Sequence, residues 1–145
     1  MPMNGLNIGR DYKFDVMTSS GLLVLPTLLN FKRKKLNHKL TVKPLNSLPI
    51  NLNFQEGGWE GSFEVSRADS TLDSYFAAYE AAYYAGVNLP AGYIQETVEE
   101  VAGTVSTFQF QGVVLYFEDA GDAEAEKNVI QRVSFAASTR IQLNS

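Results

Sequence analysis

The chain has 145 residues, of which none is cysteine and only one, His38, is histidine. Without cysteine there is no disulfide framework, no thiolate-ligated metal and no cysteine nucleophile, and one imidazole excludes a multi-histidine metal cage within a subunit. Hydrophobic residues make up 45% and charged residues 19%, a composition typical of a globular protein rather than a disordered one. We expect a single domain over residues 1–145, because a chain of this length buries a core without covalent staples.

Charge is divided unevenly along the sequence. Residues 1–50 hold eight Lys or Arg against two Asp, a net charge of +6, whereas residues 51–145 hold four cations against fourteen carboxylates, a net charge of −10. The formal charge of −4 is therefore the remainder of two opposed blocks.

Targeting segments are not evident in the sequence. The first residues lack the apolar core of a signal peptide, and the run GLLVLPTLL is short and interrupted by Pro26. No stretch approaches the roughly 20 apolar residues that cross a bilayer. We expect a soluble protein that is made in a cytoplasm and has no membrane partner.

Hydrophobic residues alternate with a period of two over most of the chain, which predicts β-strands with one buried face. In chain order, the predicted strands are residues 12–17, 28–34, 39–42, 50–54, 58–67, 92–102, 105–117 and 128–143. In the strand 58–67, Trp59, Gly61, Phe63 and Val65 share the predicted inner face. The second half of 105–117 is apolar on both sides, which indicates a strand that is buried on both faces or meets a partner.

Three further features are predicted around these strands. The long strand 128–143 is expected to bury Phe135, Ile141 and Leu143 on one face and to expose Ser134 and Arg140 on the other. A turn at residues 102–103 is expected to join the strands 92–102 and 105–117. Residues 37–58 contain two prolines and a Gly-Gly pair and are expected to form a long extended loop.

One segment, at about residues 69–85, has helical spacing instead. Its aromatic and apolar residues recur every three or four positions, Asp69 or Ser70 can accept N–H bonds at the start, and Gly86 suits a left-handed C-terminal cap. The predicted core stripe of this helix is Leu72, Tyr75, Phe76, Tyr79 and Tyr83. The fold class is therefore mainly β, an antiparallel β-sandwich or barrel with one flanking α-helix.

Catalytic and metal-binding patterns are weak in this sequence. His38 lies in the basic stretch KRKKLNHK, and there is no nucleophile elbow, phosphate-binding glycine loop or dinucleotide fingerprint. The acidic segment 118–126 fails the spacing of a calcium loop, because Ile130 stands where a bidentate glutamate is needed. Glu96, Glu99 and Glu100 are interpreted as solvated surface. We expect no enzyme activity, no metal and no cofactor, although spacing alone does not exclude a glycosidase-type carboxylate pair.

The basic stretch is interpreted as a contact between copies of the chain rather than as a nucleic-acid-binding site, since it has no interleaved aromatic platform and the whole chain is acidic. If copies associate head to tail, the positive surface of one meets the negative surface of the next. The residues predicted at this inter-subunit interface are Lys32, Arg33, Lys34, Lys35, Lys39 and Lys43 on one side and Glu118, Asp119, Asp122, Glu124 and Glu126 on the other.

Residues 58–86, GWEGSFEVSRADSTLDSYFAAYEAAYYAG, resemble the centre of the tail tube proteins of contractile-tailed bacteriophages. In that family a strand of the type GWxGxFExxR runs into a helix that starts with Asp-Ser and ends in Tyr-Tyr-Ala-Gly. The later segments PAGYIQETVEE, GVVLYFEDAGD and QRVSFAASTRIQ resemble the family's closing strands. The resemblance covers roughly residues 57–142, and the first 56 residues match less clearly.

The resemblance implies a structural subunit whose six copies form a ring, with inner sheets joined into a continuous β-barrel and rings stacked into a tube. It implies a sheath protein, a tape-measure protein and baseplate or terminator proteins as partners, with transient non-specific DNA contact in the lumen. It also implies a place in the virion after synthesis in the host bacterial cytoplasm. The type VI secretion tube protein is similar in fold, and the long loop 37–58 matches in position the loop that reaches a neighbouring subunit or ring.

Two alternatives stay open at this point. One is a related tail component, such as a tube initiator, a terminator or a baseplate hub ring, which forms a single ring and never stacks. The other is a β-barrel module or enzyme that holds a small apolar ligand against Tyr75, Tyr79 and Tyr83.

Overall fold

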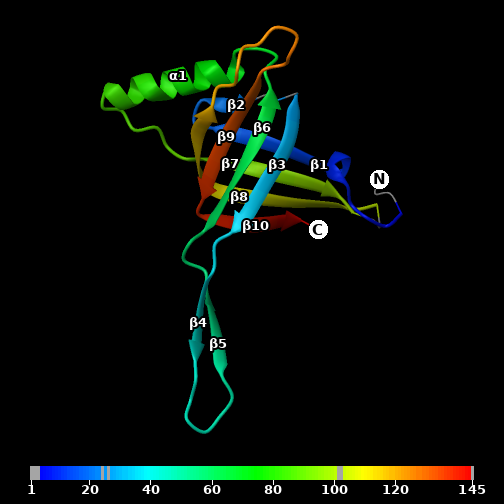
Figure 1. Ribbon diagram of the computed structural model, residues 1–145, viewed down its shortest axis with the longest axis vertical. Coiled ribbons are helices and arrows are strands. Elements are labelled where there is room, and N and C mark those ends of the chain that lie inside the picture. The colour runs from blue at the N-terminus through cyan, green and yellow to red at the C-terminus, as the bar shows by residue number, and fades with distance from the viewer. Residues whose placement is uncertain (1–3, 24, 26, 101–102, 145) are drawn as a thin grey trace.

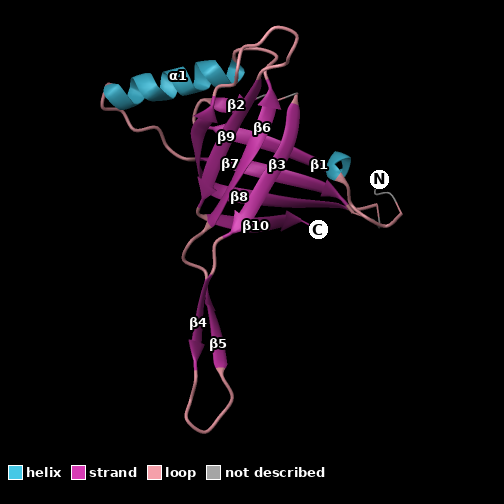
Figure 2. Ribbon diagram, in the orientation of Figure 1, coloured by secondary structure: helices cyan, strands magenta, loops and turns pink. Residues whose placement is uncertain are grey.

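The computed structural model describes residues 4–23, 25, 27–100 and 103–144, and it is mainly β with one α-helix (Figures 1 and 2). A short 3-10 turn, η1, occupies Gly9–Asp11. The remaining elements are β1 Tyr12–Thr18, β2 Gly21–Leu23, β3 Leu28–Lys35, β4 His38–Val42, β5 Ile50–Phe54, β6 Trp59–Ser66, α1 Thr71–Tyr84, β7 Gly92–Glu99, β8 Val105–Asp119, β9 Ile130–Ala137 and β10 Thr139–Asn144.

The main strands form one antiparallel ladder that folds back on itself at β8. Its order is β2-β1-β7-β8-β9-β6-β3, and β10 also pairs with β8. The first half of β8 pairs with β7 and β10, whereas residues 114–119 pair with β9. We call β2, β1, β7, β10 and the first half of β8 sheet A, and the second half of β8 with β9, β6 and β3 sheet B. The two sheets form the predicted sandwich.

The bend in β8 occurs at Gly112, whose φ is +67°. A side chain there would collide with that of Ser138, where β9 turns into β10, and the Ser138 N–H donates to the Gln111 carbonyl at 2.8 Å. Glycine is required because it adopts this left-handed conformation without a Cβ. The bend explains the two apolar faces predicted for this strand: Phe110 points into the core before it and Val113 after it.

Aromatic rings from both sheets fill the core. Phe63, Phe110 and Phe135 are at most 2% exposed, and Phe110 meets Phe135 edge-on with ring centroids 5.8 Å apart. Burial of each such side chain stabilises the fold by about 1.5–3 kcal/mol. The predicted inner face of the strand at 58–67 is confirmed, with Val65 also buried.

The predicted single strand 128–143 is wrong in its second half. The chain turns a corner at Ser138, so that β9 belongs to sheet B and β10 to sheet A. Phe135 is buried as predicted, but Ile141 and Leu143 are 38% and 50% exposed. The corner shifts the side-chain alternation by one residue, which turns Arg140 inward.

The helix forms as predicted, but its stripe is only partly buried. Gly86 has a φ of +79°, and the Val87 N–H donates to the Ala82 carbonyl, which closes the C-terminal cap. Leu72 is buried, and Tyr75 and Phe76 pack against the core.

Two tyrosines of the stripe lie further out. Tyr79 is half-buried, whereas Tyr83 is 68% exposed, so its assignment to the core is wrong. The physical reason is that α1 runs past the edge of the sandwich (Figure 1).

The predicted loop 37–58 contains a two-stranded ribbon, β4–β5, which projects away from the body (Figure 1). We call residues 37–58 the arm. The predicted strand 92–102 ends at Glu99, and Ala102, with half of the predicted turn, lies outside the described residues. Gly103 has a φ of +83°, and its N–H donates to the Glu100 carbonyl.

Candidate assembly surfaces

The arm presents an apolar face that no other part of the described chain covers. Its register sets Leu40 beside Leu52 and Val42 beside Ile50, so these side chains lie on one side of the ribbon. Each is between 40% and 52% exposed. An isolated two-stranded ribbon is marginally stable in water, and an exposed apolar face of this kind is typical of surfaces that contact another molecule.

Part of each charge block lies at one end of the longest axis of the molecule (Figure 1). Lys39 and Lys43 are exposed on the arm, at one end. At the other end, the last residue of β8 and the loop that follows it expose a group of carboxylates, which we call the acidic loop; its members are Asp119, Asp122, Glu124 and Glu126. Arm and acidic loop therefore cannot meet within one chain.

The acidic loop is ordered by local bonds. The Gly121 N–H donates to the Asp119 carboxylate at 2.8 Å, and the Lys127 ammonium lies 3.0 Å from the Glu124 carboxylate. The loop borders a cavity of about 420 Å³. One cation among four carboxylates leaves this end of the molecule negative.

The outward face of sheet B carries nearly balanced charge. Its ionisable members are Lys32, Lys34, Arg132, Glu60, Glu64 and Glu118, with Asp119, the register partner of Arg132, at its end. Arg132 pairs with Glu64 at 3.3 Å, and the Ser134 hydroxyl donates to Glu118 at 2.6 Å. This face is thus polar and close to neutral, unlike the two ends of the molecule.

Sheet B is open at both edges within the described residues. β3 pairs only with β6, and residues 114–119 of β8 pair only with β9. Since consecutive strands of the sheet alternate in direction, β3 and β8 run opposite ways. Two copies in the same orientation can therefore add β3 of one to β8 of the next as an antiparallel pair.

A buried ion triad ties the base of the arm to sheet A. Glu96 on β7 is 1% exposed, and its carboxylate lies 2.5 Å from Nη2 of Arg140 and 2.6 Å from Nε of Arg33. The contact with Arg33 is an ion pair without hydrogen-bond alignment. Arg140 also stacks over Phe108, with 4.1 Å to the ring centroid, and over Trp59 at 5.2 Å.

The triad corrects three predictions. Glu96 is not solvated surface; Arg140 is not on the outward, water-facing side of its strand; and Arg33 is not part of the exposed basic patch. A signal existed for Glu96, because it alternates with Ile94 and Val98, which are both buried. No local pattern identified its two partners.

The other predicted interface residues are divided among four places. Lys32 and Lys34 lie on the outward face of sheet B together with Glu118, and Lys39 and Lys43 lie on the arm. Lys35 is half-buried, with its ammonium 5.6 Å from the centroid of the Trp59 ring. The remaining carboxylates form the acidic loop.

Groups with catalytic potential are dispersed. His38 is exposed on the arm and stacks near Phe54, with ring centroids 6.1 Å apart. The described residues contain no group of three or more His, Asp or Glu placed to hold a metal ion.

Two residues have shifted pKa values. Burial, and secondarily Tyr79, raises the pKa of Tyr75, while a hydrogen bond from the Thr71 side chain is the main cause of the lowered pKa of Asp69. Among the described helices, none is long and apolar enough to span a membrane.

Comparison with solved structures places the fold. A chain of the PVC sheath/tube terminator of an extracellular contractile injection system superposes with a TM-score of 0.62 at 10% identity, covering 90% of this chain and 92% of that one. The chain has a tail-tube-like fold. A chain of the anti-feeding prophage baseplate superposes with a TM-score of 0.63 at 8% identity, covering 98% of both chains. A chain of the anti-feeding prophage tube-terminating cap superposes with a TM-score of 0.59 at 11% identity, covering 100% of both chains. No protein-family model and no curated protein matches the sequence.

Proposed function

We propose that this protein is a structural, non-enzymatic subunit of a bacteriophage tail tube, which forms hexameric rings that stack into a conduit for genome ejection. The observation that carries the proposal is sheet B, with its two open edges of opposite strand direction. The tail-tube-like fold supports it, as does a fold neighbour whose baseplate structure is 6-fold symmetrised.

The strand directions are compatible with ring closure. Each copy contributes four strands of alternating direction, so β3 of one copy continues the sheet of the next at β8, and the edges disappear when the ring closes. Closure gives each edge strand the backbone hydrogen bonds that it lacks in the monomer.

The outward face of sheet B lines the lumen in this arrangement. Its other face is covered by sheet A and α1. This second layer takes up more room than sheet B alone, so it lies on the outside of the closed barrel, where the circumference is larger. The lumen surface then carries three cations and four carboxylates per copy, with Asp119 counted at its rim. DNA passing through meets no net positive field and makes only weak, non-specific contacts.

Stacking uses the two ends of the molecule. The arm of one ring extends to the acidic loop of the next, where Lys39 and Lys43 meet Asp122, Glu124 and Glu126. The apolar face of the arm becomes covered at the same time. Opposite charge sets the direction and register of this head-to-tail contact.

The wider setting is a contractile tail. We propose a surrounding sheath, a tape-measure protein in the lumen and baseplate or terminator proteins at the tube ends, in a particle assembled in the bacterial cytoplasm. The similarity to chains of terminator and cap structures favours a second candidate, a tube terminator. A terminator forms one ring and does not stack.

Electron microscopy of purified charge variants tests the proposal. In low salt, the wild type is expected to form stacked rings, and the double variant Lys39→Glu/Lys43→Glu single rings, because like charges then oppose at the stacking contact. Lys39→Arg/Lys43→Arg keeps the charge and is the matched control, which stacks. Stacking of the reversed variant would disprove the charge pairing, single rings of the wild type would favour the terminator, and a persistent monomer would reject the ring.

A further inference from the structure

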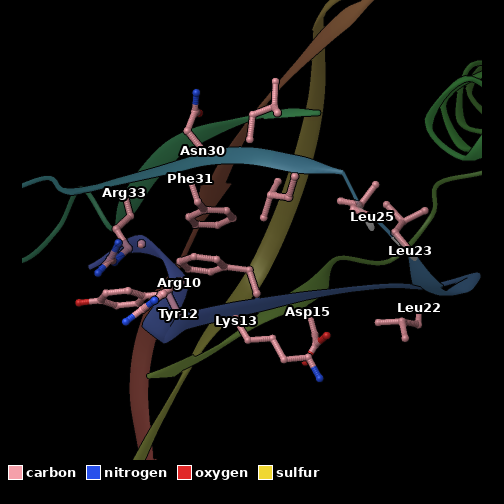
Figure 3. Close-up of a pocket in the computed structure, with 14 residues that line it drawn as sticks. Arg10, Tyr12, Lys13, Asp15, Leu22, Leu23, Leu25, Asn30, Phe31 and Arg33 are labelled. Atoms are coloured by element: carbon pink, nitrogen blue, oxygen red, sulfur yellow. The ribbon is translucent and has the colours of Figure 1, made fainter. Parts of the chain in front are cut away.

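An apolar groove opens between β1 and β3, on the side where the two sheets do not pair. Its volume is about 860 Å³, and Figure 3 shows Phe31 pointing from β3 toward β1. Phe31 stacks on Phe14 with ring centroids 3.9 Å apart, and both line the groove. At its mouth, Leu22 and Leu29 are 50% and 51% exposed. No part of the described chain covers these leucines.

A second apolar surface lies on the opposite side of the molecule, at the end of α1. Tyr83 and Tyr84 are 68% and 79% exposed, and Val87, just beyond the helix cap, is 55% exposed. Figure 1 shows this end of α1 projecting past the body on the side away from β3. Two adjacent exposed tyrosines are typical of residues that anchor a protein contact.

Ring closure brings these two surfaces together. α1 packs on the core side of sheet B at its β8 edge, where Phe76 stacks on Phe117 with centroids 4.7 Å apart. The groove lies on the same side of sheet B at its β3 edge. When β8 of one copy pairs with β3 of the next, the end of α1 therefore lies over the groove of that neighbour.

Charge favours the same contact. The rim of the groove includes Arg10 and Lys13, both exposed, with Asp15 as a partial counter-charge. α1 contains no Lys or Arg; Asp73, in its first turn, is paired with Arg67, and Glu80 is exposed nearer its C-terminal end. The C-terminal end of a helix also carries partial negative charge from its aligned peptide dipoles.

We infer that the last turn of α1, through Tyr83, Tyr84 and Val87, docks in the groove between β1 and β3 of the adjacent copy in the ring. The inference rests on the proposed ring. The docked helix end adds side-chain contacts between neighbouring copies to the backbone pairing of their sheet edges. Each contact covers the mouth at Leu22 and Leu29 and the exposed tyrosines at once.

Disulfide trapping tests this contact, because the chain has no cysteine of its own. The double variant Leu29→Cys/Tyr84→Cys places one thiol at the groove mouth and one on the helix end, both at exposed positions that the fold tolerates. The matched control, Leu143→Cys/Tyr84→Cys, uses a leucine of equal exposure on the outward face of sheet A. Mild oxidation and a non-reducing gel measure linked chains, and electron microscopy of the same samples scores rings.

The expected result is a ladder of linked chains up to the ring number, with at least about tenfold more product than the control pair, since docked thiols react at millimolar effective concentration. Rings without this ladder would overturn the docking contact and leave the proposed function intact. Monomers without a ladder would overturn both. A ladder from Leu29→Cys/Leu45→Cys in its place would show that the arm fills the groove, and would also overturn the inference.

Discussion

Glu96→Gln is expected to lower the stability of the fold sharply, because it removes the only carboxylate between Arg33 and Arg140 in the triad. The carboxylate is 1% exposed, with an arginine nitrogen within 2.6 Å on each side. Removing one partner of a buried ion pair costs about 3–5 kcal/mol, because the remaining charge is left uncompensated. The guanidinium side chains are 28% and 21% exposed, so water screens them in part and we expect a loss of about 3 kcal/mol.

This loss is large beside the total stability of about 5–15 kcal/mol that is typical of a domain. With a urea dependence of about 1.5 kcal/mol per molar, the unfolding midpoint falls by about 2 M. Urea titrations followed by circular dichroism measure it, at one protein concentration and in high salt, because assembly adds apparent stability. Glu60→Gln, at an exposed position of sheet B, is the matched control and is expected to change the midpoint little.

A compensated variant separates lost charge balance from lost packing. Arg33→Met/Glu96→Leu/Arg140→Met replaces the whole triad by apolar side chains and is expected to recover most of the stability, since it leaves no buried charge unpaired. If the free energy of unfolding of Glu96→Gln is within about 1 kcal/mol of the wild-type value, as is expected for the control, the triad does not hold the base of the arm to sheet A.

Two further predictions concern the bend and the helix. Gly112→Ala is expected to lower the free energy of unfolding by about 2–3 kcal/mol, from left-handed strain of about 1–2 kcal/mol plus the clash with Ser138. Gly103→Ala is the matched control, because Gly103 has a similar φ but no atom within 4 Å of the added Cβ. Urea titration should therefore show only the cost of backbone strain for this variant. Equal losses of unfolding free energy in the two variants would refute the clash with Ser138. Because burial raises the pKa of Tyr75 above its ordinary value of 10.0, the unfolded chain loses this proton first and stability falls as pH rises past that value. Tyr75→Phe is expected to flatten the alkaline decline in thermal unfolding, and an unchanged decline would contradict the assignment.

The sequence predicted the elements whose pattern is local. Alternation in the strand 58–67 and helical spacing from Leu72 to Phe76 depend on neighbouring residues, and both agree with the structure. The corners at Gly112 and Ser138 were missed because side-chain alternation shows which face is buried only while a strand stays in one sheet. Exposure of Tyr83 depends on where the sheet ends, which helical periodicity does not encode.

The candidate surfaces were predicted in part for the same reason. The uneven charge of the sequence indicated two opposed blocks, and the structure separates Lys39 and Lys43 from the acidic loop along the longest axis. The sequence did not indicate that Arg33, unlike its basic neighbours, pairs with Glu96, because that contact joins residues far apart in the chain.

Cryo-electron microscopy of the purified protein is the decisive experiment for the proposed ring, because it resolves both ring closure and the path of sheet B. We expect closed sixfold rings in which β3 of each copy pairs antiparallel with β8 of the next, with the face carrying Lys32 and Glu118 toward the lumen. Monomers at every protein and salt concentration, or rings in which sheet B keeps its open edges, would contradict it.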